Sequence, residues 1–253
     1  MRVAVMSPTY NERENINRFL SIVRAAVPQA DIFIVDDDSP DGTAACVSEW
    51  SAKDSTVHLL SRRGARGYAE ASREGLTNIA ARGYDVIITI DCDLSHDPLV
   101  IPIMLEHISN GADVVVGSRY VRGGGVRNWS LFRRLLSRWG NLYTSFMLGV
   151  RVRDCTSGFR AYRGDVIREG WLGTTTSSGY AFLSEILFRL RSDKSISILE
   201  TPIVYQDRTA GESKMNKTII GESMRLVTSW GLSRLFSGSS GARKRPSGNR
   251  YLL

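Results

Sequence analysis

The chain has 253 residues, of which 42% are hydrophobic and 23% are charged, and its formal net charge is +7 at pH 7. This composition is that of an ordinary soluble globular protein, and it excludes a fibrous or wholly disordered chain. Its three scattered cysteines, Cys46, Cys92 and Cys155, lack paired spacing, so a disulfide framework and a structural zinc site are excluded as well.

The first 120 residues alternate short β-branched runs with amphipathic segments. The runs predict strands at residues 3–6, 32–36, 57–60, 86–90 and 114–116. The segments between them predict helices at residues 13–27, 43–52, 69–81 and 99–109. This alternation predicts βαβ units, and therefore an α/β fold with a mostly parallel sheet and helices on both faces.

The rest of the chain follows without a linker. It predicts helices at residues 128–148, 181–191 and 217–236 and strands at residues 158–162 and 197–205. We therefore expect one domain over residues 1–215, an amphipathic helix over residues 216–236, and a basic, disordered Gly/Ser-rich tail over residues 237–253. A basic tail can contact nucleic acid or anionic lipid, but a solvated end without function explains it at least as well. We assign no function to the tail and expect no nucleic-acid partner for the protein.

Polar side chains follow the first predicted strand, in the segment Ser-Pro-Thr-Tyr-Asn-Glu. Pro8, Tyr10 and Glu12 stand at the carboxyl end of this strand, the edge at which parallel sheets bind ligands. A tyrosine ring can stack on a base, and a carboxylate can accept hydrogen bonds from a base or a sugar. For Glu12 the alternative is a favourable charge at a helix N-terminus, worth less than about 1 kcal/mol.

The second strand ends in an acidic turn, Val-Asp-Asp-Asp-Ser-Pro-Asp-Gly-Thr, which begins at Val35. Asp37 is the favoured binding residue in this turn. Asp41 has an equally good structural explanation, because Ser-Pro-Asp-Gly is turn chemistry and Asp41 or Thr43 can cap the next helix.

Asp91 and Asp93 follow the apolar run 86–90, and Pro98 opens the next predicted helix. Two carboxylates about 4 Å apart repel by about 4 kcal/mol at an effective dielectric near 20, so an exposed pair is usually relieved by a divalent cation. An Asp-x-Asp alone is a weak signal, but here it joins two other strand-end motifs. His96 is placed to orient an aspartate or the metal shell.

Five motifs in this order carry a resemblance: Pro-Thr-Tyr-Asn-Glu, Val-Asp-Asp-x-Ser-Pro-Asp-Gly-Thr, Asp-x-Asp-Leu-Ser-His, Gly-Ser-Arg-Tyr and Thr-Ser-Gly-Phe-Arg. From about residue 3 to residue 217 the chain resembles the dolichol-phosphate mannose synthases, and more broadly the family 2 inverting glycosyltransferases. The resemblance implies a Rossmann-like GT-A fold. It also implies transfer of mannose from GDP-mannose to dolichyl or polyprenyl phosphate, with a β-linked product.

The resemblance also implies individual roles. The guanosine part of the donor would contact Pro8, Tyr10, Glu12, Val35 and Asp37. The diphosphate, the sugar and an Mg2+ or Mn2+ ion would be bound by Asp91, Cys92 and Asp93, and Ser95 stands where some relatives carry a metal-holding Gln. A loop that closes over the diphosphate would contribute Arg208 and Lys214. A cradle for the acceptor phosphate would comprise Arg119, Arg133 and Ser137.

The proposed chemistry agrees with these residue types. Arginine binds phosphate in a bidentate manner, and Arg133 and Ser137, four residues apart, lie on the same helix face. A phosphate acceptor is already anionic near pH 7, so it can attack the sugar without a catalytic base. The catalytic set is then Asp91, Asp93, Arg119 and Arg208, which align the reactants and neutralise the leaving diphosphate.

The helix at 128–148 mixes aromatic residues, leucines and arginines as interfacial helices do, and residues 219–236 are a second amphipathic candidate. The alternative for the first helix is core packing with a basic outer face. The lipophilic uncharged stretch 139–150 is shorter than the roughly 18 to 20 apolar residues of a spanning helix, and residues 1–5 lack a signal-peptide pattern. We expect a peripheral protein on the cytoplasmic face of a membrane, and a membrane-anchoring protein partner is compatible with this expectation.

Two alternatives stay open. The same fold could use another donor, such as UDP-glucose, or a saccharide or protein acceptor, in which case a catalytic base would be needed. A hypothesis of another class is a catalytically silent nucleotide-sugar-binding or scaffold subunit. Evidence against a catalytically silent subunit is the intact set of candidate site residues: Asp91, Asp93, Arg119, Arg208 and Lys214.

Overall fold

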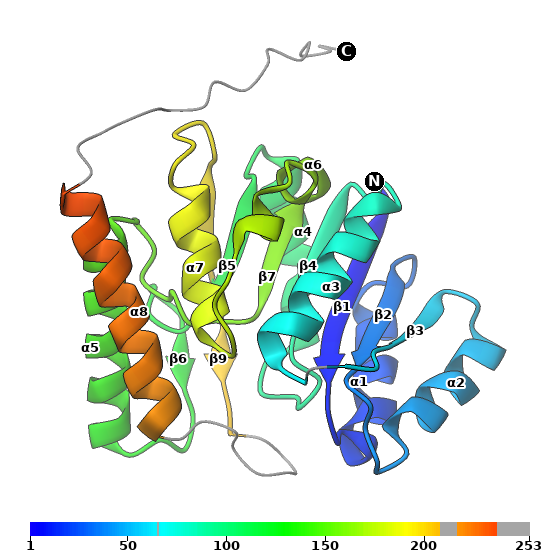
Figure 1. The fold of residues 1–253 in the computed structure, drawn as a ribbon. Helices are drawn as coiled ribbons and strands as arrows, with labels where there is room; N and C mark the ends of the chain where they lie inside the picture. Colours follow the sequence, from blue (N-terminus) through cyan, green and yellow to red (C-terminus); the bar gives the residue numbers. More distant parts are fainter. Residues whose placement is uncertain (65, 208–216, 237–253) are drawn as a thin grey trace.

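A computed structural model of the chain describes residues 1–64, 66–207 and 217–236. Its centre is a seven-stranded sheet with the strand order β3-β2-β1-β4-β7-β5-β8 (Figure 1). These strands are β1 (Val3–Thr9), β2 (Asp31–Asp36), β3 (Val57–Ser61), β4 (Val86–Thr89), β5 (Val114–Ser118), β7 (Arg160–Arg163) and β8 (Ile198–Pro202). Strand β7 is antiparallel to β4 and β5, and the other pairs are parallel. The predicted mostly parallel α/β sheet is confirmed.

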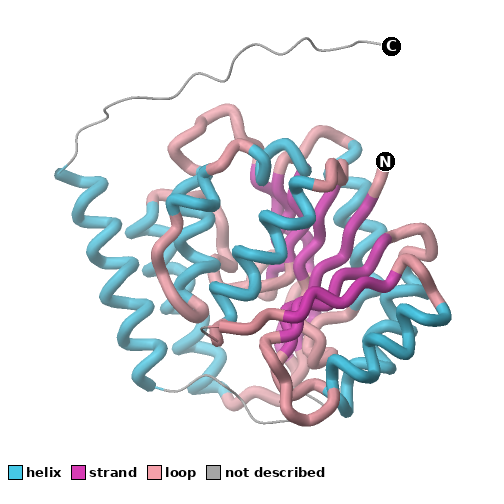
Figure 2. The backbone as a smooth tube through the Cα atoms, turned by 45° about the vertical axis from the view of Figure 1, so that its right-hand side comes forward, coloured by secondary structure: helices cyan, strands magenta, loops and turns pink. Residues whose placement is uncertain are grey.

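Helices cover both faces of the sheet because successive strand residues point to opposite sides. In β1, Val5 belongs to the core under α1 (Arg13–Ala26), α2 (Thr43–Lys53) and α4 (Ile101–Ser109). Its neighbours Ala4 and Met6 belong to the core under α3 (Tyr68–Ala81), α6 (Gly164–Arg168) and α7 (Ala181–Leu190). Figure 2 shows the strands between these two helical layers. Two short 3-10 helices, η1 (Pro98–Val100) and η2 (Trp171–Thr174), complete the connections.

Two long helices, α5 (Leu131–Leu148) and α8 (Lys217–Phe236), lie side by side beyond α7 (Figure 1). The Tyr143 and Thr228 hydroxyls form a hydrogen bond of 2.7 Å between them. The ring of Phe188 in α7 stacks on Trp230 of α8, with 5.9 Å between centroids. The predicted helix at 217–236 is confirmed, whereas the predicted domain boundary at 215 and the tail 237–253 lie outside the described residues.

The helix predicted at 128–148 begins three residues later, so the predicted start at Asn128 was wrong. Asn128 has a φ of 61°, which an α-helix does not accommodate. Ser130 caps the helix instead, because its hydroxyl accepts a hydrogen bond of 3.3 Å from the main-chain N–H of Arg133.

Proline accounts for two other differences. The strand predicted at 197–205 ends at Pro202, which has no N–H to donate to a ladder, and the chain continues as β9 (Val204–Tyr205). That short strand pairs in parallel with β6 (Gly125–Val126). The helix predicted at 99–109 divides into η1 and α4, because Pro102 cannot donate to the carbonyl of Pro98 four residues earlier.

The sheet register brings three strand ends together. Pro8 is paired with Val35, and Thr9 with Asp36, between β1 and β2. On the other side of β1, Met6 is paired with Thr89 of β4. The segments that follow β1, β2 and β4 therefore leave the sheet at the same edge, which is where the sequence places its candidate binding residues.

Candidate active site

A cavity of about 320 Å³ opens at this edge of the sheet. Most of the described residues that the sequence assigns to donor binding line it: Pro8, Tyr10, Glu12, Asp37, Asp91, Cys92 and Asp93. Val35 does not line the cavity, because its fully buried side chain packs in the core beside Met6, so its predicted donor contact finds no support here. Arg208 and Lys214 lie outside the described residues. Sequence reasoning missed the other wall, which includes Arg66, Tyr68 and Tyr180.

The first part of the cavity is formed after β1. Glu12 precedes α1, and its carboxylate accepts a hydrogen bond of 2.8 Å from the Asn15 side chain. The hydroxyl of Tyr10 accepts a hydrogen bond of 3.0 Å from Arg66, whose guanidinium lies 5.0 Å from the centre of the Tyr10 ring. Arg66 comes from the loop before α3, so two separate segments shape this end of the cavity.

In the acidic turn after β2, one of several aspartates reaches the cavity. Asp37 is buried, forms an ion pair with Arg62 and accepts a hydrogen bond of 2.7 Å from the main-chain N–H of Gly67. Asp41 instead accepts from the N–H of Thr43 at 2.9 Å and from its hydroxyl at 2.6 Å. The structural explanation therefore holds for Asp41, and Asp37 is left as the residue that faces the cavity.

The acidic pair follows β4. The Asp93 side chain is buried and accepts a hydrogen bond of 3.0 Å from the main-chain N–H of Ser95, across a turn in which Leu94 has a φ of 59°. The Asp91 side chain is 25% exposed. Cys92 between them packs in the core, and its burial raises the pKa of the thiol well above the ordinary value. A thiol buried in this way is a poor nucleophile.

The donor chemistry of Asp91 and Asp93 fits a hard divalent cation, because both offer carboxylate oxygens to the same cavity. Among the described residues, no group of three or more His, Cys, Asp or Glu side chains could hold a metal. Two carboxylates, completed by phosphate oxygens and water, are the arrangement that Mg2+ commonly accepts. Ser95 is buried and lines a different cavity, so the structure does not support it as the third ligand.

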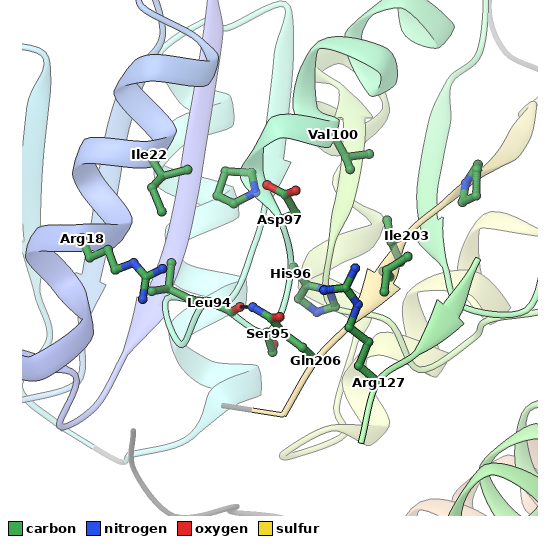
Figure 3. A pocket seen from close by; sticks show the side chains of 13 residues that line it. Arg18, Ile22, Leu94, Ser95, His96, Asp97, Val100, Arg127, Ile203 and Gln206 are labelled. Carbon is green, nitrogen blue, oxygen red and sulfur yellow. Dashed lines mark hydrogen bonds between the residues drawn. The ribbon is translucent and has the colours of Figure 1, made fainter. Parts of the chain in front are cut away.

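That second cavity, of about 420 Å³, lies on the other side of the turn after β4. Figure 3 shows Arg18 of α1 on one side of it and Arg127 on the other, with His96 between them. His96 is buried against the rings of Phe159 and Tyr205, and burial lowers its pKa to about 4. Its Nε2 lies 3.8 Å from an Asp91 oxygen, which is too long for a hydrogen bond.

The predicted acceptor residues lie at the end of β5 and on α5. The guanidinium of Arg119 makes two hydrogen bonds of 2.7 Å to Asp154, which is fully buried. Tyr120, the next residue, donates a hydrogen bond of 2.6 Å from its hydroxyl to Ser137. The fold thus brings Arg119 and Ser137 into one region. The sequence analysis missed Asp154, because no sequence pattern pairs it with Arg119.

Arg133 lies in the first turn of α5. Its guanidinium stacks 3.9 Å from the centre of the Trp129 ring and forms an ion pair of 3.1 Å with Asp207. Both charged side chains are about half exposed, at 48% and 44%. Trp129 also donates a hydrogen bond of 2.9 Å to Asp207. Asp207 is the last described residue before the segment that carries Arg208.

The outer face of α5 is apolar and exposed. Its exposed large hydrophobic residues are Leu131, Phe132, Leu135, Leu136, Trp139, Leu142 and Phe146. Arg133, Arg134 and Arg138 are exposed on the same helix. The core-packing alternative is therefore wrong for this face. No helix in the described part of the chain is long and apolar enough to span a bilayer.

Comparison with known proteins identifies the family. The undecaprenyl-phosphate mannosyltransferase of Micrococcus luteus is 42% identical over 239 residues, which cover 94% of this chain and 97% of that protein. The polyprenol monophosphomannose synthase of Mycolicibacterium smegmatis is 40% identical over 232 residues, which cover 91% of this chain and 87% of that protein.

A similar solved structure is the glucosyl-3-phosphoglycerate synthase of Mycobacterium tuberculosis in complex with Mn2+, UDP and phosphoglyceric acid. It superposes with a TM-score of 0.64 at 21% identity, covering 95% of this chain and 80% of that chain. This likeness confirms the predicted GT-A fold. The family model described as glycosyl transferase family 2 matches residues 4–171, and the chain belongs to this family.

Proposed function

We propose that the protein transfers mannose from GDP-mannose to a polyprenyl or dolichyl phosphate and forms a β-linked lipid-phosphate sugar. The observation that carries this proposal is the cavity that gathers Tyr10, Asp37, Asp91 and Asp93 at one sheet edge. Two relatives that match most of the chain are named for mannose transfer to polyprenyl phosphates, which supports both the sugar and the acceptor class.

The donor would lie across the strand ends. Tyr10 would stack on the guanine and Asp37 would accept from it, whereas Asp91 and Asp93 would hold a divalent cation, Mg2+ or Mn2+, at the diphosphate. When bound, this cation would neutralise charge that develops on the leaving diphosphate. Arg208 and Lys214, outside the described residues, are proposed to add positive charge when their segment approaches the diphosphate.

The acceptor phosphate would bind near Arg119, Arg133 and Ser137 and attack the anomeric carbon from the face opposite the diphosphate. A phosphate oxygen forms the new bond to that carbon, and the bond to the diphosphate oxygen breaks. The carboxylates beside these arginines, Asp154 and Asp207, are both held in ion pairs. Asp154 is fully buried in its pair, so it is not poised as a base for a sugar hydroxyl, which favours an acceptor that is already anionic.

The apolar face of α5 would lie in the interface of the membrane that holds the lipid acceptor. Its exposed leucines and aromatic rings suit the acyl boundary, and its arginines suit anionic headgroups. We propose that the enzyme lies on the cytoplasmic face as a peripheral protein. A membrane-anchoring protein partner is compatible with this arrangement, but the proposed activity does not depend on it.

Incubation with radiolabelled GDP-mannose, a divalent cation and a polyprenyl phosphate tests this function. We expect the label to move into the organic phase, and to do so only when the lipid carries its phosphate. Parallel reactions with UDP-glucose, and with a free saccharide as acceptor, test the alternatives. Label that stays wholly in water with every lipid phosphate would contradict the proposal.

A further inference from the structure

One wall of the donor cavity consists of two tyrosines from distant parts of the chain. Tyr68 is the first residue of α3, and Tyr180 directly precedes α7. Their rings are stacked, with 4.9 Å between centroids and 24° between planes. Neither tyrosine belongs to one of the sequence motifs, and the proposed function assigns a role to neither of them.

The position of Tyr68 shows which end of the cavity this wall occupies. A Cβ atom on Gly158 would lie 2.7 Å from the Tyr68 hydroxyl and 3.5 Å from both carboxylate oxygens of Asp91. Gly158 precedes β7, the neighbour of β4 on the side away from β1. The hydroxyl end of Tyr68 thus lies close to Asp91 on the β7 side of the cavity, whereas its main chain follows Gly67, which donates to Asp37 at the end of β2.

This placement matters because a nucleotide sugar carries its diphosphate between the nucleoside and the sugar. The proposed function places the nucleoside at the ends of β1 and β2 and the diphosphate at Asp91 and Asp93. We then expect the sugar beside Asp91, where the Tyr68 hydroxyl lies close to that carboxylate and Tyr180 stacks on Tyr68. Aromatic rings offer apolar faces that pack against the C–H faces of a sugar ring.

The segment that carries Tyr180 is held by a buried carboxylate. Glu185 in α7 has no exposed surface, and it accepts hydrogen bonds of 3.1 Å and 2.9 Å from the main-chain N–H groups of Thr176 and Ser177. The Ser177 hydroxyl donates to the same carboxylate. Burial raises the pKa of Glu185, but the hydrogen bonds from Ser177 outweigh it and lower the pKa below the ordinary value. Glu185 is therefore ionised at neutral pH and fixes the main chain three residues before Tyr180.

A second side chain ties this segment to the helix of Tyr68. Arg73 in α3 donates hydrogen bonds of 2.8 Å to the Thr175 hydroxyl and 3.0 Å to the Ser177 carbonyl. Its guanidinium also lies 5.0 Å from the centre of the Phe182 ring in α7. Glu185 and Arg73 together fix the segment from both sides, so the two tyrosines have a defined relative position.

We propose that Glu185 is a positioning residue for the donor sugar, which acts by holding Tyr180 against Tyr68 as the wall on which the sugar ring lies. The inference rests on the proposed function for the identity of the donor. It predicts that loss of Glu185 affects the sugar part of the donor and leaves the nucleotide part unchanged. A carboxylate with a merely structural role would affect both parts equally or neither.

The test compares the dissociation constants of GDP and GDP-mannose, measured by titration calorimetry with Mn2+ and without lipid. In E185Q and in Tyr180→Leu, we expect GDP-mannose to bind about threefold to tenfold more weakly, whereas GDP binding changes less than about twofold. Tyr180→Phe keeps the ring and should retain the affinity of the wild type. Glu185 also pairs with Arg189 at 3.0 Å. Asp113→Asn is the matched control, because Asp113 is likewise a buried carboxylate with main-chain and arginine partners but precedes β5 at the opposite edge of the sheet.

Equal weakening of GDP and GDP-mannose in E185Q, or a loss of thermal stability alone as in the Asp113 control, would overturn the proposal. If E185Q does not fold, Tyr180→Leu tests the wall directly, because the Tyr180 ring is partly exposed and the Glu185 carboxylate is bonded to Thr176 and Ser177. A wild-type protein that binds UDP-glucose in preference to GDP-mannose would refute the proposed donor. The same comparison, made with UDP and UDP-glucose, then still decides the role of Glu185.

Discussion

The donor side and the acceptor side that we propose for the site are built differently. The donor side is assembled from the ends of β1, β2 and β4, and main-chain N–H groups hold the carboxylates of Asp37 and Asp93. The acceptor side is assembled from β5 and α5 and borders exposed apolar side chains such as Phe132. A water-soluble nucleotide sugar requires fixed polar contacts, whereas a lipid phosphate requires an open apolar approach. The difference therefore matches the two substrates that we propose.

The acceptor side itself contains a second contrast, between two arginines. Arg119 is held in a buried, bidentate pair with Asp154, so its position is fixed. Arg133 pairs with Asp207 at the surface, where such pairs contribute little to stability. Arg133 can therefore exchange Asp207 for a phosphate at small cost. Arg119 cannot leave Asp154 in the same way, because the buried Asp154 carboxylate would lose its charged partner.

The largest effect should come from the donor side. Asp93→Asn removes a charged oxygen from the proposed metal and diphosphate site, and we expect the transfer rate to fall by about 10²–10³-fold or more. Steady-state transfer kinetics measure this loss. Asp97→Asn is the control in the same turn, because Asp97 caps η1 and asparagine can do the same. Unchanged turnover in Asp93→Asn would refute the metal role.

The next effect concerns stability. Arg119→Ala leaves Asp154 buried without its partner, and we expect the free energy of unfolding to fall by about 3–5 kcal/mol. Arg133→Ala should change it by less than about 1 kcal/mol. Urea unfolding of both variants measures the difference. Equal stabilities would show that the buried pair is not the fixed element of the acceptor side.

The same pair gives a pH dependence. Burial raises the pKa of Asp154, but the charge of Arg119 outweighs burial and holds it below the ordinary value of 3.8. The pair's contribution to wild-type stability is therefore complete above about pH 4 and is lost as the pH falls through the lowered pKa. In Arg119→Ala the carboxyl is buried without a cation, so its pKa should rise. The stability gap between the two proteins should then shrink as the pH is lowered, and a constant gap from pH 7 to pH 3 would contradict this account.

A smaller effect is expected for the apolar face. Replacement of both Phe132 and Trp139 by serine should weaken binding to anionic vesicles by about tenfold or more, because both rings are more than half exposed and available to the interface. Vesicle co-sedimentation measures the change. Leu99→Ser, at an exposed leucine in η1, is the matched control and should leave vesicle binding unaltered. Equal losses in both proteins would contradict an interfacial role for α5.

The smallest effect separates the two substrates. Arg133→Ala should raise the KM for polyprenyl phosphate by about tenfold, since one charge-assisted contact of about 1.5 kcal/mol is removed. The affinity for GDP-mannose should stay within about twofold of the wild type. Transfer kinetics at varied lipid concentration, paired with donor titrations, test this. Similar losses for donor and acceptor would remove Arg133 from the acceptor cradle.

The sequence could predict the donor side because strand ends carry their own signals. The β-branched runs locate β1, β2 and β4, and parallel pairing brings their carboxyl ends together, so Tyr10, Asp37 and Asp91 meet in one cavity as expected. The sequence could not show that the side chains of Val35 and Ser95 lie outside the donor cavity, because the direction of one side chain depends on the exact turn geometry.

Long-range partners were beyond the reach of the sequence as well. Asp154 and Glu185 appear ordinary in the sequence, and their roles depend on contacts with Arg119 and Ser177 that form only in the folded chain. The tyrosine wall has the same origin, since the strands β4, β5 and β7 lie between Tyr68 and Tyr180 in the sequence. Local patterns thus locate elements and strand ends, whereas pairs between distant segments require the structure.

The most direct test of the two-sided site is a crystal structure with GDP-mannose, Mn2+ and a short-chain polyprenyl phosphate. We predict the guanine at Tyr10 and Asp37, the diphosphate and metal at Asp91 and Asp93, and the lipid phosphate at Arg133. A nucleotide bound in the second cavity, beside Arg18 and Arg127, would contradict the account.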